Sequence, residues 1–409
     1  MRDNERVNRI CAALKRERLD ALVCALPAYV LMNTGYWPVI GTSVCITTAD
    51  GRQLVVAPED EEDLANRGWA EVHTYKPASL DKIESVAHAI GGPLYEAAQA
   101  ADITGGRIGF ERGPASEPAS YAGMNLFKGS ILTVIHEAIP GATPVPADEL
   151  LDELAAVKTT REVENIRASC QIAQHAFEHG SMMLHNGLSE AAAATNFRAP
   201  LSIVGLEHQA VARADGFTFC MSGPNSAKAS GAYARSRSRK IEQGDLALVH
   251  CNSYADGYWT DITRTYSIGE PDDRKMEIYE AVFAARTAAL KAIRAGVQAS
   301  EVDRVAREKL ARRGFQKEFK HSTGHGIGFA AISANARPRI HPKSNEILEV
   351  GMVFNVEPAV YIEGLGGIRH CDMVVVTKTG AEVLTPFQCA PDDLILTAER
   401  LAERRRNAA

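Results

Sequence analysis

The sequence divides near residue 146 into two parts that differ in the order of their expected helices and strands. This difference restricts the possible folds more than any other feature of the sequence. In the first part, helices and strands alternate: apolar residues recur at helical spacing from Val7 to Leu14, and the apolar run at 21–26 is typical of a buried strand. Further strands are expected at 43–48, 53–57 and 107–110. We therefore expect residues 1–146 to form a small α/β domain.

A cluster of helix-breaking residues separates this part from the rest of the chain. Pro140, Gly141, Pro144 and Pro146 are typical of a linker or of a turn into a helix. After them, helices and strands come in separate runs, which favours an α+β fold over a doubly wound sheet. The expected helices start near residues 159, 272 and 300, and the expected strands lie at 246–252, 258–268, 352–357 and 368–376. Residues 147–409 thus form the second, larger domain.

Composition excludes several classes of protein. The chain has 409 residues, with 45 Lys+Arg against 51 Asp+Glu and a net charge of −6, so nothing favours a nucleic-acid or anionic-membrane partner. Its longest nearly apolar run, residues 21–32, is broken by Pro27 and is shorter than the roughly 20 residues of a membrane helix. The charged N-terminus lacks the apolar stretch of a signal peptide, so we expect a cytoplasmic location.

The cysteines do not indicate a disulfide scaffold. Eight of them are scattered over 409 residues, with no CxxC pair and no zinc-finger spacing. In a reducing compartment most are expected to be small buried apolar residues. Cys371 is the exception, because it lies in a segment with other chemically active residues.

A hairpin carries the first candidate site residues. Asp256-Gly257 separates two strand patterns and is a strong signal for a two-residue turn. With that loop His250 faces Thr263, and His250 and Asp261 become diagonal neighbours on one face of the sheet. The alternative is that Asp261 pairs with Arg264 and that His250 is an ordinary core histidine.

Three later segments carry the remaining candidates. Three glycines surround His325 in the segment 321–328, which indicates that something approaches the backbone closely. Glu357 ends an apolar strand, although a strand-end acid is often only a surface group. In the strand pattern after Gly366, Arg369 and Cys371 lie on one face and His370 and Asp372 on the other, while an inert core thiol is the alternative for Cys371.

Together these segments resemble the pita-bread family of creatinase, prolidase and aminopeptidase P, peptidase family M24. The motifs that carry the resemblance occur in the family's order: SGPNSA, DGYWTDITRT, HSTGHGIG, GMVFNVEPAVY and GGIRHCD. The resemblance implies a pita-bread fold for the second domain, preceded by a smaller creatinase-like α/β domain. It also implies a hydrolase, with a homodimer as in relatives that dimerise.

The resemblance further implies a metal site. The family's peptidases hold two metal ions with Asp, Asp, His, Glu and Glu, and the matching positions here are His250, Asp261, His325, Glu357 and Cys371. Two of the five therefore depart from the family pattern, since a histidine and a cysteine replace carboxylates. His321 matches a family histidine that contacts substrate or shuttles protons.

These two departures change the expected metal. Imidazole and thiolate suit zinc, whereas carboxylates suit manganese, so we expect one or two zinc ions, with manganese or no metal as alternatives. On the substrate side, two histidines of the family's peptidases are replaced by Ser230 and Ile332. That difference weakens the assignment to a peptidase.

We therefore expect a metal-dependent hydrolase of an amide or related C–N bond in a small molecule or short peptide. Glu357 is expected to act as a ligand or general base, His321 to polarise the substrate or shuttle a proton, and Arg369 to orient a carboxylate. The alternatives are a metal-free amidinohydrolase resembling creatinase and a non-catalytic binding module on the same fold. The sequence does not name the substrate.

Overall fold

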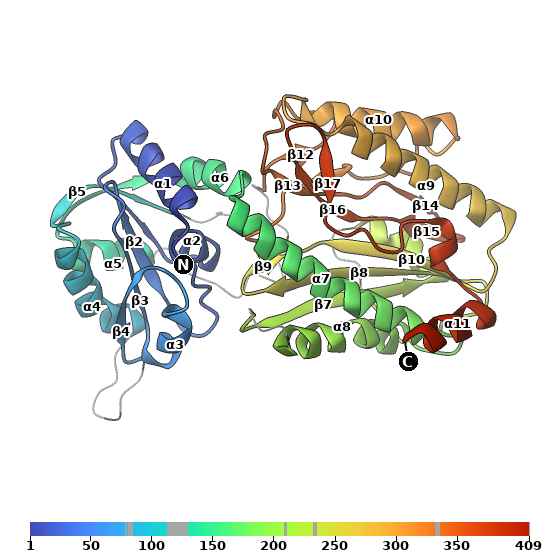
Figure 1. The fold of residues 1–409 in the computed structure, drawn as a ribbon, viewed down its shortest axis with the longest axis horizontal. Coiled ribbons are helices and arrows are strands. Elements are labelled where there is room, and N and C mark those ends of the chain that lie inside the picture. Colours follow the sequence, from blue (N-terminus) through green and yellow to red (C-terminus); the bar gives the residue numbers. More distant parts are fainter. Residues whose placement is uncertain are drawn as a thin grey trace. The chain divides into compact units, whose positions relative to one another are not determined.

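The computed structural model describes residues 1–77, 80, 85–112, 130–207, 211–231, 235–331 and 336–408 (Figure 1). Contacts between residues divide the chain into two units, residues 1–155 and residues 156–331 with 336–409. The division at residue 146 stays a prediction, but the interpretation of the proline cluster as a linker is wrong, because these residues form strand β6 (Gly141–Pro146), which pairs with residues 105–110.

A six-stranded mixed sheet forms the centre of the first unit, in the order β4-β3-β2-β1-β5-β6. The expected strands are confirmed. β1 is fully buried, because it pairs on both sides: antiparallel with β2 and parallel with β5. The strands are β1 (Ala21–Cys24), β2 (Val44–Thr48), β3 (Gln53–Pro58), β4 (Glu71–Tyr75), β5 (Gly105–Phe110) and β6 (Gly141–Pro146).

Helices cover this sheet. Val7, Ile10 and Leu14 are buried on the first helix, as their spacing predicts. The aliphatic side chains of α4 and α5 pack into one cluster with those of β1, β2 and β3. The helices are α1 (Asn4–Glu17), α2 (Pro27–Thr34), α3 (Glu62–Ala65), α4 (Val86–Ala100), α5 (Ser130–Ala138) and α6 (Asp148–Ala156), with a 3₁₀ turn η1 (Glu59–Glu61).

A buried carboxyl group lies just beyond β5. One oxygen of Glu111 accepts hydrogen bonds from the backbone N–H groups of Ala25 and Leu26, where α2 begins. The side chain is 3% exposed, and this burial raises its pKa from 4.5 to about 7. The folded state therefore holds the proton of Glu111 at pH values where the unfolded chain has lost it.

Glu111 is expected to make the chain less stable as pH rises. Its folded pKa is raised, so the unfolded state releases the proton first, and the stability loss begins near pH 4.5 and is complete above pH 7. The free energy of unfolding of the Glu111→Gln variant minus that of the unsubstituted chain should therefore increase by about 2–3 kcal/mol when the pH is raised from 5 to 8. Urea unfolding at both pH values measures this gain. A difference that does not change with pH would contradict the prediction.

The second unit contains several short sheets. The largest has the order β18-β10-β8-β7, with β9 paired to β8, and the others are β11-β12, β13-β16-β17 and β14-β15. The strands are β7 (Ala214–Ser222), β8 (Leu246–Ala255), β9 (Tyr258–Trp259), β10 (Ile262–Ile268), β11 (Gly324–His325), β12 (Arg339–Ile340), β13 (Val353–Val356), β14 (Ala359–Ile362), β15 (Gly366–Arg369), β16 (Asp372–Val376), β17 (Ala381–Val383) and β18 (Ile395–Leu396).

The hairpin has the predicted register. Asp256 and Gly257 have positive φ angles of 46° and 82°, as a type I′ turn requires. The flanking residues Ala255 and Tyr258 pair directly, so the loop contains two residues. His250 consequently faces Thr263, which confirms the expected parity.

Long helices pack against these sheets. The capping box of Thr159 and Glu162 is present at the start of α7, as the sequence predicts. The helices are α7 (Thr160–Met182), α8 (Glu190–Glu207), α9 (Asp273–Ala292), α10 (Ala299–Arg312) and α11 (Ala398–Ala408), with 3₁₀ segments η2 (Gly223–Ser230) and η3 (Pro391–Leu394). Within the described ranges, none of the helices has the length and apolar character that crossing a membrane requires.

Candidate metal and catalytic site

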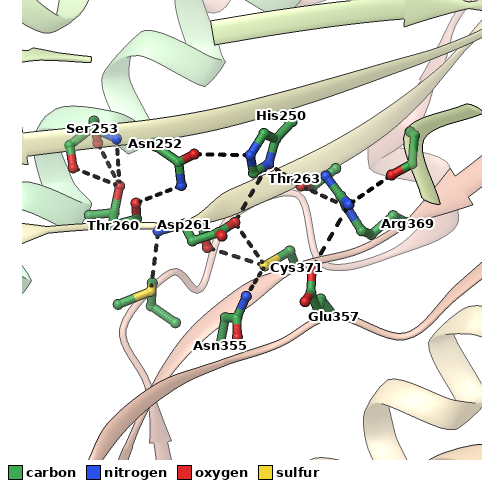
Figure 2. A network of polar contacts seen from close by, with 12 residues as sticks. His250, Asn252, Ser253, Thr260, Asp261, Thr263, Asn355, Glu357, Arg369 and Cys371 are labelled. Atoms are coloured by element: carbon green, nitrogen blue, oxygen red, sulfur yellow. Dashed lines mark hydrogen bonds and ion pairs between the residues drawn. The ribbon is translucent and has the colours of Figure 1, made fainter. Parts of the chain in front are cut away.

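Segments far apart in the sequence carry the predicted ligands, and Figure 2 shows four of them, His250, Asp261, Glu357 and Cys371. A bridge pairs Thr263 of β10 with Cys371, which places the thiol beside the start of β10. The N–H of Glu357 donates to the carbonyl of Thr323 at 2.8 Å, which joins the end of β13 to the segment before His325.

Asp261 is the centre of this arrangement. Its Oδ1 lies 3.5 Å from His250 Nδ1 and 3.6 Å from Cys371 Sγ, and its Oδ2 lies 3.7 Å from His325 Nε2. The carboxylate is 3% exposed, so these contacts form in a largely dry environment. The alternative pairing of Asp261 with Arg264 is wrong, because Arg264 pairs with Asp372 at 2.8 Å.

The thiol of Cys371 is fully buried. It donates to the backbone carbonyl of Asp261 at 3.2 Å, and Asn355 Nδ2 donates to its sulfur at 3.5 Å. Burial, together with the negative charge of Asp261, raises the pKa of Cys371 well above its usual value. A protonated thiol is a poor nucleophile, so the thiolate would need a bound cation to form here.

His250 is held as a neutral imidazole. Its Nδ1 lies 3.1 Å from Thr263 Oγ1 and its Nε2 lies 3.0 Å from Asn252 Oδ1. Burial lowers its pKa to about 4, although the negative charge of Asp261 acts in the opposite direction. A neutral imidazole is the form that binds a metal ion.

Glu357 is the candidate general base. It is 8% exposed, and burial raises its pKa to about 8. The positive charge of Arg369 opposes this rise, but its Nη1 is 4.0 Å from Glu357 Oε2, which is too long for a close pair. Arg369 is itself held by Thr263, at 3.1 Å from Nε to Oγ1, and by the carbonyl of Ala229.

His321 lies beside this group and contacts a residue that the sequence did not single out. Its Nε2 is 2.9 Å from the hydroxyl of Tyr361, and Arg369 Nη1 donates to the same hydroxyl at 3.5 Å. Burial lowers the pKa of His321 to about 4, and the positive charge of Arg369 lowers it further. Tyr361 therefore connects His321 to Arg369.

Asn355 was missed as well. Its Oδ1 accepts from the N–H of His325 at 2.7 Å, and its amide nitrogen contacts both Cys371 Sγ and His325 Nε2. A signal for this residue was available, because Asn355 and Glu357 are two positions apart in an extended segment and can share a face.

The donor atoms fit a divalent metal ion in chemistry and in pairwise spacing. Two ligands of one tetrahedral zinc ion lie about 3.3–3.7 Å apart, given bonds of about 2.0–2.3 Å. The three contacts of Asp261 have this spacing. However, no three of these donor atoms lie within 4.8 Å of one another in the described part of the chain. A single ion shared by His250, Asp261 and Cys371 would therefore draw its ligands together.

A second cluster of potential ligands lies on the opposite face of the segment after β15. His370, Asp372 and Cys389 bring three donor atoms within 4.8 Å of one another. Yet Asp372 already pairs with Arg264 at 2.8 Å and with Arg286 at 2.5 Å. Two guanidinium groups neutralise the carboxylate and would repel a cation, so this cluster is a structural ion network.

Comparison with known proteins identifies the family. The model of the metallopeptidase family M24 matches residues 164–378, more than half of the chain. The chain belongs to the metallopeptidase family M24. An M24 relative, the Xaa-Pro dipeptidase of Pyrococcus horikoshii, is 27% identical over 93% of this chain and 97% of its own length.

Solved structures of the M24 family agree with this assignment. The prolidase from Pyrococcus horikoshii OT3 superposes with a TM-score of 0.73 at 26% identity, over 93% of this chain and 98% of its own. The Xaa-Pro dipeptidase from Bacillus anthracis gives 0.74 at 25% identity, over 96% and 99%. The expected pita-bread α+β fold is confirmed, and the chain is a peptidase-like hydrolase of a family that depends on divalent metal ions.

Proposed function

We propose that this M24 hydrolase cleaves the C–N bond of a dipeptide or similar small amide, with Xaa-Pro dipeptides as the first substrates to test. The observation that carries the proposal is the position of Asp261, whose two oxygens face His250, His325 and Cys371 at 3.5–3.7 Å. Relatives named Xaa-Pro dipeptidase support the substrate class. The changes at Ser230 and Ile332 are reasons to test other amides too; Ile332 lies outside the described residues.

The metal would be held by His250, Asp261, His325, Glu357 and Cys371. Their mixture of nitrogen, oxygen and sulfur donors favours zinc over manganese, and the loss of one carboxylate at His250 favours one ion over two. When bound, such an ion lowers the pKa of a coordinated water toward neutrality.

The remaining roles belong to the side chains themselves. Where Glu357 acts as the general base rather than as a ligand, its ionised carboxylate accepts a proton from the attacking water and returns it to the leaving amine. Arg369 carries a fixed positive charge that can orient the carboxylate of a substrate. The His321 ring donates from Nδ1 to the carbonyl of Ser322 at 2.8 Å, so its Nε2 accepts from the Tyr361 hydroxyl at 2.9 Å, and this pair can carry a proton.

The charge and the cysteines of the chain bear on its location in the cell. The acidic chain, with a net charge of −6 and scattered free cysteines, is consistent with a cytoplasmic enzyme. We further propose that it works as a homodimer on small soluble substrates.

Metal removal tests the function. Protein purified without added metal is expected to contain zinc, and chelation should lower Xaa-Pro dipeptide turnover by at least about 100-fold, with recovery on adding zinc. Elemental analysis and a ninhydrin assay for released proline measure both quantities. Cys371→Ala should lose most of the zinc, whereas Cys170→Ala, which truncates another buried cysteine in α7, should keep it.

The metal-free alternative has one observation in its favour. Every nitrogen and sulfur donor of the site already contacts a protein group, since Thr263 and Asn252 contact His250 and Asn355 contacts both His325 and Cys371. Protein with far less than one ion per chain, and turnover that chelators do not change, would favour this alternative and contradict the metal-dependent one.

A further inference from the structure

Helix α10 carries an ion pair beside the candidate site, between the buried carboxylate of Asp303 and the partly exposed guanidinium of Arg307. Asp303 and Arg307 are one helical turn apart, and Arg307 binds both carboxylate oxygens, at 2.6 Å from Nε and 3.2 Å from Nη2. Asp303 is fully buried, whereas the side chain of Arg307 is 31% exposed.

Both members of the pair also form hydrogen bonds with the segment that carries His321. Asp303 Oδ1 accepts from the N–H of Thr323 at 3.0 Å and from its hydroxyl at 2.8 Å. Arg307 donates to the carbonyls of Phe319 at 3.3 Å and of His321 at 2.5 Å. Charge-assisted bonds of this kind are about twice as strong as neutral ones.

The same contacts extend to Glu357. The carbonyl of Thr323, whose N–H and hydroxyl are fixed by Asp303, accepts the N–H of Glu357 at 2.8 Å. On the other side, Arg307 Cζ lies 4.4 Å from the ring centroid of Phe319. The rings of Phe319 and His321 form a T-shaped pair with their centroids 5.3 Å apart. One ion pair therefore reaches both candidate proton-transfer residues, His321 directly at its backbone carbonyl and Glu357 through Thr323.

We propose that Asp303 and Arg307 are positioning residues that set the distance between His321 and Glu357. This proposal rests on the catalytic roles proposed above. A displacement of about 1 Å at such groups can lower turnover by a factor of about 100 without much change in substrate binding. The pair itself does not touch the substrate.

The surroundings of Arg307 make it a good place to test this role. A cavity of about 520 Å³ borders the pair on the side of α10, and its lining includes Arg304, Gln316 and Pro342. Space for water is therefore available when the guanidinium is removed. Arg304 lies on the same helix and beside the same cavity, but it pairs with the exposed carboxylates of Glu301 and Glu308 on its own helix. Arg304→Met is thus a matched control.

The experiment compares Arg307→Met, Arg307→Lys and Arg304→Met in the full-length, metal-loaded chain. Arg307→Met is expected to lower kcat by about 10–100-fold with KM changed by less than about threefold. Arg307→Lys keeps the charge and should recover part of the loss. Arg304→Met should behave as the unsubstituted chain. Metal content and melting temperature show whether a loss arises from unfolding or from loss of the ion.

Amide hydrogen exchange provides a measurement that does not depend on activity. In Arg307→Met, the amides of Thr323 and Glu357 should exchange faster, by about tenfold or more, because the bonds that fix them are loosened. Unchanged exchange together with unchanged kcat would overturn the proposal. If the unsubstituted chain cleaves no dipeptide, the proposed function fails, and the exchange measurement still decides whether the pair fixes the two segments.

Discussion

Asp261→Asn is expected to lower kcat/KM by roughly a thousandfold while leaving the fold intact, because several kcal/mol of transition-state stabilisation depend on this carboxylate. The amide has nearly the same shape but no negative charge. It would face His250, His325 and Cys371 at the same 3.5–3.7 Å without the charge that balances a divalent ion. Metal content should therefore fall together with activity.

The matched control is Asp256→Asn in the same hairpin. Asp256 accepts hydrogen bonds from the N–H groups of Ala212 and Arg213 and has a φ of 46°, a conformation that asparagine also adopts readily. This variant should keep its metal and its activity. Assays of dipeptide cleavage with elemental analysis compare the two variants. If Asp261→Asn keeps normal zinc and turnover, Asp261 is not the centre of the site.

The second large effect concerns stability. Arg264→Met is expected to lower the free energy of unfolding by about 3–5 kcal/mol, the cost of breaking a buried ion pair by removing one partner. Arg264 is fully buried, pairs with Asp372 at 2.8 Å and donates to the carbonyls of Cys371 and Phe387. Methionine fills much of the volume but removes a donor from both carbonyls, and it leaves Asp372 with one of its two guanidinium partners, Arg286.

The comparison variant is Arg313→Met. Arg313 forms an ion pair of similar length, 2.9 Å, with Glu280, but both side chains are exposed, so the loss should stay below about 1 kcal/mol. Chemical denaturation of both variants measures the difference. Equal losses would show that burial of the Arg264 pair contributes little to stability.

Local rules were enough to predict the hairpin and its consequences. An Asp-Gly pair fixes a two-residue turn, the turn fixes the register, and the register places His250 and Asp261 side by side. In the same way, strand alternation placed Arg369 and Cys371 on one face and His370 and Asp372 on the other. The structure confirms this, because Arg369 contacts Thr263 and Cys371 contacts Asp261, whereas His370 Nε2 lies 3.4 Å from Asp372 Oδ2.

The partners of these groups could not be predicted from local rules. Arg264 was an obvious neighbour for Asp261 in sequence, yet it pairs with Asp372, which lies 108 positions further along the chain. Tyr361 reaches His321 from a strand 40 positions away. Such contacts depend on how separate sheets pack, and neither periodicity nor turn chemistry carries that information.

The side-chain amide of Asn252 has a consequence for which ring nitrogen of His250 holds the proton. Its nitrogen donates to the carbonyl of Thr260, so Asn252 presents its Oδ1 to His250 Nε2, and an amide oxygen can only accept. The proton of the neutral imidazole therefore resides on Nε2, and the hydroxyl of Thr263, which accepts from Arg369 Nε, donates to Nδ1. One asparagine thus selects the tautomer of His250 whose lone pair is on Nδ1, the nitrogen that lies 3.5 Å from Asp261 Oδ1.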